Sequence, residues 1–402
     1  MSGRKKNNNR KSGKNPILEA FGWYKHGDYY DYNLVAVIIL LTCFGLVMLY
    51  STSSYMARIN YNGDDMHYFR KQGLISLVCF GVAIVVSKFD YHLLWKWITP
   101  IYGMGLFLMV LVKTPLGVTA NGARRWLGVG SFTFQPAEVA KIAVIVTLSY
   151  MIVKMGRNVR KLKACMYLAL AGGIQTLGAY VLTDNLSTAI IILCITIGMI
   201  FVAHPELKVF LIILAVGVAG VILFVAFLYS VLDPATVTDF RLRRILVWLR
   251  PEEFADSDGY QTLQALYAIG SGGFLGRGLG NSIQKLGSIP EAQNDMIFSI
   301  ICEELGVLGA IIVLLLFAYL LYRLFFIAQN AADLFGSMIV TGIFIHIALQ
   351  VILNISVVLN IIPNTGVTLP FISYGGTSIL FLMGEMGLAL SVARQIKFQD
   401  VE

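Results

Sequence analysis

Long apolar segments separated by short polar ones run along almost the whole chain. A spanning helix needs about 20 mostly apolar residues, and ten segments meet that length. The pattern therefore predicts an all-α polytopic membrane protein with about ten transmembrane helices. The predicted spans are residues 33–53, 69–87, 92–112, 137–153, 165–182, 186–203, 208–231, 296–322, 334–355 and 374–394.

Two details of this pattern concern single connections. The fifth and sixth spans are compatible with one hairpin whose polar apex is Thr183, Asp184 and Asn185. At that apex we expect Asp184 or Asn185 to cap a helix. The segment IIPNTGVTLPFISYGGTS between the last two spans is rich in Pro, Gly, Ser and Thr, so we expect a folded-back segment that lines a cavity or is buried in protein.

Composition supports the membrane assignment. The chain has 402 residues, of which 57% are hydrophobic and 13% charged, with a mean hydropathy of +0.73. That balance excludes an ordinary soluble globular domain. The five cysteines all lie in apolar segments without metal-ligand spacing, so we interpret them as small core residues.

Positive charge in the loops predicts the topology. Lys and Arg concentrate in the N-terminal tail and in alternate loops, which places both termini in the cytoplasm. We divide the chain into a disordered basic cytoplasmic tail (1–31), a transmembrane domain (32–396) and a short cytoplasmic tail (397–402). The domain includes a large extracellular loop, 232–295, between the seventh and eighth helices. Its first part favours an amphipathic interfacial helix.

The predicted outer loops are unexpectedly basic. Arg124 and Arg125 lie in one of them, and Arg243, Arg244 and Lys285 lie in another. A long loop can be translocated regardless of its charge. The clustering favours instead an anionic ligand, such as phosphate or pyrophosphate, because a guanidinium group binds these through two donors at once.

One acid faces these cations. Asp295 lies where the large loop enters the eighth span, within GLGNSIQKLGSIPEAQNDMIFSIICEELG (278–306). An ionisable residue at a membrane boundary is a candidate functional residue. Deeper in the predicted spans, Glu138 and Lys141 lie on one helix face, either as a mutual ion pair or as ligand-binding groups. His346, Asn354 and Glu385 are further polar positions within the spans. We interpret His346 as a packed, helix-facing histidine and expect Glu385 to face the bundle interior.

Four segments carry a resemblance to a known family: GLVMLYSTSS (45–54), NGARRWLGVGSFTFQPAEVAK (121–141), the stretch 259–306 and NTGVTLPFISYGGTS (364–378). In this order they resemble the SEDS family of cell-wall glycan polymerases, which includes FtsW, RodA and SpoVE. The resemblance extends over residues 33–396. The stretches GLGNSIQKLGSIPEA and GVTLPFISYGG are similar to the FtsW division branch.

The resemblance implies a peptidoglycan glycosyltransferase that polymerises lipid II on the outer face of the cytoplasmic membrane, for septal synthesis. Asp295 matches the essential aspartate of the family, as general base or as the group that positions the attacking hydroxyl. Substrate contacts are implied for Arg243, Arg244, Lys285, Arg124, Arg125, Glu138, Lys141, Gln284, Ser373 and Tyr374.

This chain departs from the family at two places. His-Thr commonly precedes the aspartate, whereas here Gln293 and Asn294 do, which argues against a histidine relay. Asn185 occupies a position that is usually Asp in the family, and Asp184 lies beside it. The resemblance therefore assigns no role to an acid at position 185.

The implied partners are lipid II, a class B penicillin-binding protein, other divisome proteins and membrane lipid, with no nucleic acid. No cofactor or metal site is evident, and a divalent cation is left open. Two alternatives are a lipid II flippase and a scaffold without catalytic activity. Charges and broken segments in the membrane also fit a flippase, but no inverted repeat is visible.

Overall fold

The computed structural model describes residues 30–120, 123–129, 132–204, 207–231, 240–257, 259–286, 289–290 and 292–396. Most of the predicted tails, 1–29 and 397–402, lie outside the described residues. Asp31, which the sequence placed in the N-terminal tail, caps the first described helix and forms a salt bridge of 2.6 Å with Arg323. Asp31 is therefore part of the helical domain and not of the predicted tail.

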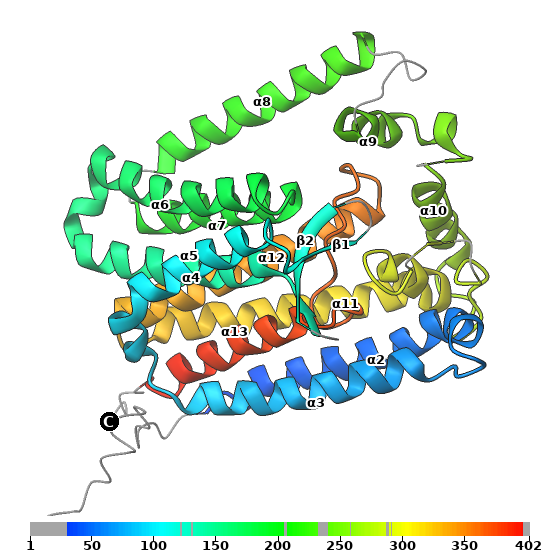
Figure 1. Ribbon diagram of the computed structural model, residues 1–402, viewed down its shortest axis with the longest axis horizontal. Helices are drawn as coiled ribbons and strands as arrows, with labels where there is room; N and C mark the ends of the chain where they lie inside the picture. Colours follow the sequence, from blue (N-terminus) through cyan, green and yellow to red (C-terminus); the bar gives the residue numbers. More distant parts are fainter. Residues whose placement is uncertain are drawn as a thin grey trace, which may run out of the picture.

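The long helices form one bundle except for α8, which lies apart from it at an angle (Figure 1). They are α2 (Tyr32–Asn60), α3 (His67–Lys88), α4 (Ile98–Leu111), α5 (Pro136–Met155), α6 (Leu162–Val181), α7 (Leu186–Ala203), α8 (Leu207–Val231), α11 (Ile297–Asn330), α12 (Leu334–Val358) and α13 (Ser378–Ala393). Short 3₁₀ helices η1 (Tyr91–Trp97) and η2 (Gly156–Arg160) join some of them.

Every predicted span is a helix. In the described residues, eight helices are long and apolar enough to cross a membrane. The other two predicted spans are α8 and α13, which contain shorter apolar helical stretches. The predicted all-α polytopic fold class is thus confirmed.

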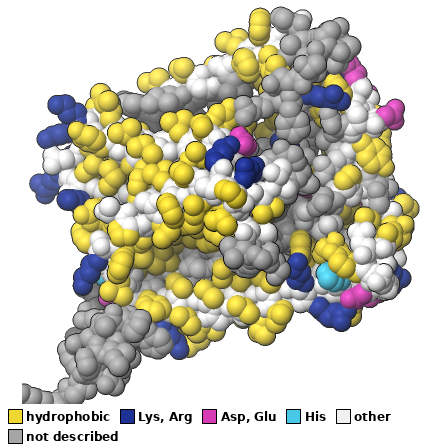
Figure 2. Space-filling model, viewed as in Figure 1, with side chains coloured by type: hydrophobic (Ala, Val, Ile, Leu, Met, Phe, Trp, Pro, Cys, Tyr) yellow, Lys and Arg dark blue, Asp and Glu magenta, His cyan; other side chains and the backbone are white. Residues whose placement is uncertain are grey.

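Burial within the bundle separates a protein core from a lipid-compatible surface. α5 packs against α4, α7 and α12, and α11 packs against α2 and α12. Apolar side chains also cover the flanks of the long helices, as Figure 2 shows. Exposed leucines and isoleucines on the outside of a soluble bundle would be costly, whereas lipid accepts them.

α6 and α7 form the hairpin that the sequence suggested. They pack against each other across a turn at 182–185. Asn185 is the cap: its side chain accepts a hydrogen bond of 3.0 Å from the Thr188 N–H. Asp184 adopts a left-handed backbone with φ of 48°.

The loop between α4 and α5 contains a small sheet that the sequence did not predict. Strands β1 (Gly117–Ala120), β2 (Ala123–Val129) and β3 (Phe132–Phe134) are antiparallel in the order β1-β2-β3. Leu127 pairs with Gly117 on one side and Phe134 on the other.

The large loop contains more helix than predicted. The expected amphipathic helix is α9 (Phe240–Leu249), whose Leu246 and Val247 pack on Phe254 of η3 (Pro251–Phe254). A second helix, α10 (Tyr260–Gly272), was not predicted, and it packs along α11. Its buried Leu263, Ala265 and Ala268 supply the contact face.

The Gly-dense stretch after α10 serves close backbone packing. α11 is kinked at Gly306, where φ is 66°. A Cβ at Gly306 would lie 2.4 Å from the backbone nitrogen of Gly276, so neither backbone leaves room for a side chain. The N–H groups of Arg277 and Gly278 donate to the carbonyls of Glu303 and Glu304, at 3.0 and 2.9 Å. These two amides therefore provide hydrogen-bond donors for the carbonyl groups of α11 next to its kink.

The segment 359–377 folds back into the bundle, as expected. Phe371 is buried with φ of 62°. Its carbonyl lies against α2 at Gly45, where a Cβ would be 2.6 Å from that oxygen. On α12, the Gln350 side chain donates to the Thr368 carbonyl at 3.2 Å. Non-helical backbone is tolerated at this depth because protein groups satisfy it.

Asp333, between α11 and α12, joins several elements at the end of the bundle opposite to the folded-back segment 359–377. It accepts the Gly336 N–H at 2.9 Å, a short hydrogen bond from Tyr91 Oη, and contacts His92 Nε2 at 3.0 Å. Burial acts to raise the pKa of Asp333, but the bonds from Tyr91 and Gly336 and the neighbouring His92 together lower it. The ionised carboxylate is thus stabilised by folding.

Replacing Asp333 should destabilise this end of the bundle. We expect Asp333→Ala to cost about 1–2 kcal/mol, since it removes a helix cap and the acceptor of Tyr91. Because the folded pKa is lowered, this contribution is present above the unfolded pKa of about 4 and is lost as pH falls through the folded pKa. Thermal melting of detergent-solubilised protein measures it. Asp333→Asn, which keeps an oxygen acceptor, should lose less; an equal loss would contradict the capping role.

Candidate functional site

Asp295 is held against the folded-back loop. It lies in the turn that enters α11, with a half-buried side chain. Its carbonyl accepts a hydrogen bond of 2.8 Å from the side-chain amide of Asn354 on α12. The same nitrogen donates to the Val367 carbonyl, also at 2.8 Å. A Cβ at Gly366 would lie 3.8 Å from Asp295 Oδ2, so the carboxylate faces this loop.

A second hydrogen bond joins these loops. The Tyr374 N–H donates to the Gln293 carbonyl at 2.9 Å. The backbone around Asp295 is thus tied through Asn354 to α12 and to Val367 in the folded-back segment, and through Gln293 to Tyr374 near the end of that segment.

Two predicted cations interact across a long separation in sequence. Arg125 on β2 is half-buried, and burial lowers its pKa; the charge of Arg244 on α9 lowers it further, while Asp184 acts in the opposite direction. We call Arg125 and Arg244 the arginine pair. Arg125 is half-buried whereas Arg244 is exposed, and guanidinium groups suit phosphate oxygens.

The neighbouring arginines have different surroundings. The Arg124 guanidinium makes a short hydrogen bond to the Thr114 carbonyl. Arg243 lies over the Phe254 ring, 5.7 Å from its centroid. The pairing of β1 with β2 skips Arg125, which is therefore the extra residue of a β-bulge next to Arg124.

Lys285 is part of a buried cluster, which the sequence did not predict. Its Nζ lies 2.7 Å from Glu304 Oε1 and donates to Ser51 Oγ at 2.9 Å and to the Gly280 carbonyl at 2.7 Å. Ser51 also donates to Glu304 at 2.7 Å, and Glu304 is fully buried. We call Lys285, Glu304 and Ser51 the clasp. It fastens the loop before Asp295 to α2 and α11. With the Gly280 carbonyl, Ser51 and Glu304 give the three N–H donors of the Lys285 ammonium group three partners.

The remaining predicted positions also have structural surroundings. Glu138 and Lys141 form a buried ion pair of 2.9 Å on α5, which is the structural alternative considered for them. Ser373 Oγ accepts the Leu369 N–H at 2.9 Å. The Tyr374 ring packs edge-on against Tyr68, and Gln284 Oε1 is buried without a partner among the described residues. Their predicted substrate contacts stay predictions.

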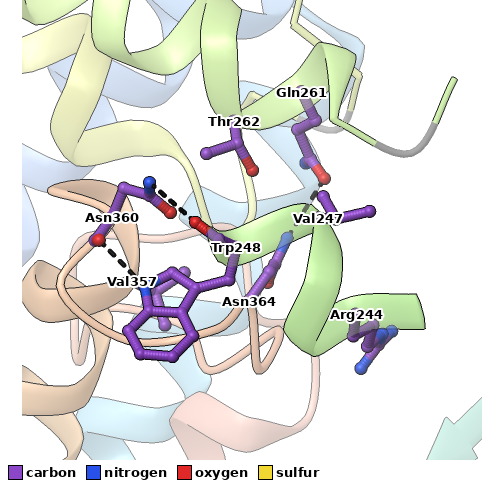
Figure 3. Close-up of a pocket in the computed structure, with 8 residues that line it drawn as sticks. All are labelled: Arg244, Val247, Trp248, Gln261, Thr262, Val357, Asn360 and Asn364. Atoms are coloured by element: carbon purple, nitrogen blue, oxygen red, sulfur yellow. Dashed lines mark hydrogen bonds between the residues drawn. The ribbon is translucent and has the colours of Figure 1, made fainter. Parts of the chain in front are cut away.

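A cavity of about 170 Å³ lies beside this region. Figure 3 shows it between α9, α10 and the turn after α12. Sequence reasoning did not single out most of its lining, because isolated polar and aromatic residues in short helices and turns carry no pattern. The polar and aromatic lining comprises Arg244, Trp248, Gln261, Thr262, Asn360 and Asn364.

Other residues of the site were missed for a similar reason. Asn354 was recognised as polar within a span, but nothing in the sequence indicated its two backbone partners. Glu303 and Glu304 were a signal that was not used: two consecutive acids in an apolar helix require partners. Within the part of the chain that the structure describes, no group of three or more His, Cys, Asp or Glu side chains is arranged to hold a metal ion.

Taken together, the fold and site define a polytopic α-helical membrane protein with an acid and an arginine pair in its loops at one end of the bundle. The model of the FtsW/RodA/SpoVE family, described as a cell cycle protein, matches residues 31–398, and the chain belongs to this family. The predicted SEDS membership is confirmed.

Individual relatives agree over nearly full length. Stage V sporulation protein E of Bacillus subtilis is 37% identical, covering 92% of this chain and 98% of its own. The probable peptidoglycan glycosyltransferase FtsW of Trichlorobacter lovleyi is 36% identical, covering 92% and 94%. At the level of the family, these names confirm the predicted enzyme class, peptidoglycan glycosyltransferase.

Solved structures share the fold. A chain from a peptidoglycan synthase complex, described as coordinating polymerization and crosslinking, superposes with a TM-score of 0.74 at 26% identity, covering 91% of this chain and 98% of that one. Thermus thermophilus RodA, a rod shape determining protein, gives a TM-score of 0.64 at 26% identity, covering 93% and 99%.

Breaking the clasp from one side should destabilise the protein strongly. Lys285→Met leaves Glu304 buried without its cation, and we expect a loss of about 3–5 kcal/mol. The double variant Lys285→Met/Glu304→Gln removes both charges and should recover part of that loss. Thermal melting of the purified variants measures both effects. If the double variant is no more stable than the single one, the ion pair does not carry the effect.

Proposed function

We propose that this protein polymerises lipid II into glycan strands on the outer face of the cytoplasmic membrane, in septal wall synthesis. The observation that carries the proposal is the fixation of Asp295. Two Asn354 hydrogen bonds hold its backbone and the folded-back loop together, with the carboxylate facing that loop. The basic outer loops and the FtsW relatives support the substrate class.

The chemistry requires a proton acceptor and a site for negative charge. The 4-hydroxyl of an incoming lipid II attacks the anomeric carbon of the growing chain, and the bond to its lipid pyrophosphate breaks. Asp295 accepts the hydroxyl proton or orients the hydroxyl. The arginine pair stabilises the charge that gathers on the leaving pyrophosphate, which lowers the barrier more than it strengthens ground-state binding.

Topology and partners follow from the same proposal. Both termini lie in the cytoplasm, which places the turn of Asp295, β2 and α9 outside. The synthase complex among the structural relatives supports a class B penicillin-binding protein as the partner that cross-links the product.

Removing the acid should abolish polymerisation without unfolding the protein. We expect Asp295→Asn to lower the rate by about a hundredfold or more, since general-base catalysis contributes factors of 10²–10⁴. Purified protein, alone and with its partner, is given lipid II, and glycan length is read on a gel. A dithionite assay of labelled lipid II in proteoliposomes tests the flippase alternative. Normal polymerisation by a folded Asp295→Asn variant would disprove the assignment.

The arginine pair can be tested against a neighbour of the same type. Arg125→Gln should lower kcat/KM for lipid II by about ten- to a hundredfold, the value of one hydrogen bond to a charged group. Arg124→Gln is the matched control, because its guanidinium binds the Thr114 carbonyl, and its loss should be several times smaller. Equal losses for both would mean that the pair has no special role.

A further inference from the structure

The cavity beside the arginine pair has the composition of a site for a neutral polar ligand with an apolar face. Figure 3 shows the Trp248 indole and Val357 on one side and the side chains of Gln261 and Thr262 on α10 opposite them. Asn360 and Asn364 complete the wall, and Arg244 lies at one edge. Among the residues that the structure describes, no carboxylate lines the cavity. Apolar surface with a few convergent polar groups is typical of small-molecule sites.

The polar wall is held in place by hydrogen bonds within the protein. Trp248 Nε1 donates to the Asn360 carbonyl at 3.0 Å, and Asn360 Nδ2 donates back to the Trp248 carbonyl at 3.4 Å. Asn364 Nδ2 donates to Gln261 Oε1 at 3.2 Å. Asn360 has a left-handed backbone, φ of 56°, which turns the chain at the end of α12. The wall is therefore preorganised.

These amides keep hydrogen-bonding capacity. A carboxamide has two donors and an acceptor with two lone pairs. Gln261 uses one N–H on the Pro290 carbonyl, at 3.0 Å, and Asn364 uses one on Gln261. Among the described residues, the second N–H of each has no partner. Amide donors beside an indole match the hydroxyl and acetamido groups of a sugar, whose ring also offers apolar C–H faces.

The cavity connects the two parts of the candidate site. At one edge, Arg244 belongs to the arginine pair. At the other, Asn364 accepts the N–H of Gly366 at 3.0 Å, and Gly366 faces Asp295. Gln261 binds Pro290, in the loop that leads to Asp295. A sugar diphosphate with its phosphates at Arg244 would therefore have its sugar in this cavity, next to Asn364 in the loop that faces the acid.

We propose that this cavity is a sugar subsite that takes one N-acetylhexosamine residue of the lipid-linked substrate. The inference rests on the proposed function and names where the saccharide sits. The volume of about 170 Å³ corresponds to roughly eleven to seventeen water positions of about 10–15 Å³ each, which suits one sugar ring and not a disaccharide-pentapeptide.

Saturation-transfer NMR on the full-length protein in nanodiscs tests the subsite with N-acetylglucosamine as the probe and glucose as the comparison sugar. Wild type should transfer saturation to the acetamido methyl group of the probe. Val247→Phe fills the cavity from α9 and should weaken the transfer by about tenfold. Val110→Phe, at an exposed position on α4, is the matched control and should behave as wild type.

A second variant distinguishes a specific loss of sugar binding from misfolding. Thr262→Val keeps the shape of the wall, removes one hydroxyl, and should weaken binding by about fivefold, the value of one neutral hydrogen bond. Asp295→Asn should bind the sugar as wild type does, even though polymerisation is lost, so the subsite and the catalytic proposal fail separately. The subsite is overturned if wild type shows no transfer, if glucose gives the same signal, or if folded Val247→Phe and Thr262→Val both bind normally.

Discussion

The side-chain amide of Asn354 makes the two hydrogen bonds on which the candidate site depends. It is fully buried in α12 and donates to the carbonyls of Asp295 and Val367, both at 2.8 Å. Neither segment is helical there, and unsatisfied carbonyls inside a membrane bundle cost several kcal/mol. One amide thus allows two irregular loops to meet at depth, and their meeting point positions the acid.

The same demand for partners explains the charges inside the bundle. Lys285 pairs with Glu304, Lys141 with Glu138, and His346 with Glu385 at 2.8 Å. A buried charge is tolerated when it is paired and hydrogen-bonded. These pairs fasten elements to one another, and the charge of Arg244 on α9 acts on the half-buried Arg125 on β2.

The Gly-dense loop shows how composition alone can suggest the wrong chemistry. Glycines that present N–H groups to an anion and glycines that permit close backbone packing look alike in sequence. Here Gly276 and Gly306 are in contact, and the nearby amides bind the carbonyls of the kinked α11. The loop therefore sets the path by which the chain reaches Asp295, without itself forming an anion site.

The sequence by itself determined the long helices, because a helix that crosses a bilayer requires about 20 consecutive, mostly apolar residues, and such a run is visible along the chain. It also indicated the α6–α7 hairpin from its polar apex and the fold-back of 359–377 from its Pro, Gly, Ser and Thr content. Asp295 could be named as a candidate functional residue because it is an acid at the boundary of an apolar span. The sequence did not determine β1–β3 or α10, whose short segments carry weak patterns. Which cations meet was decided only by the tertiary structure. Lys285 and Arg244 are both basic residues of the same predicted outer loop. Lys285 is buried against Glu304, whereas the charge of Arg244 acts on Arg125. The partners of a side chain are set by contacts between elements far apart in sequence, and no local pattern records them.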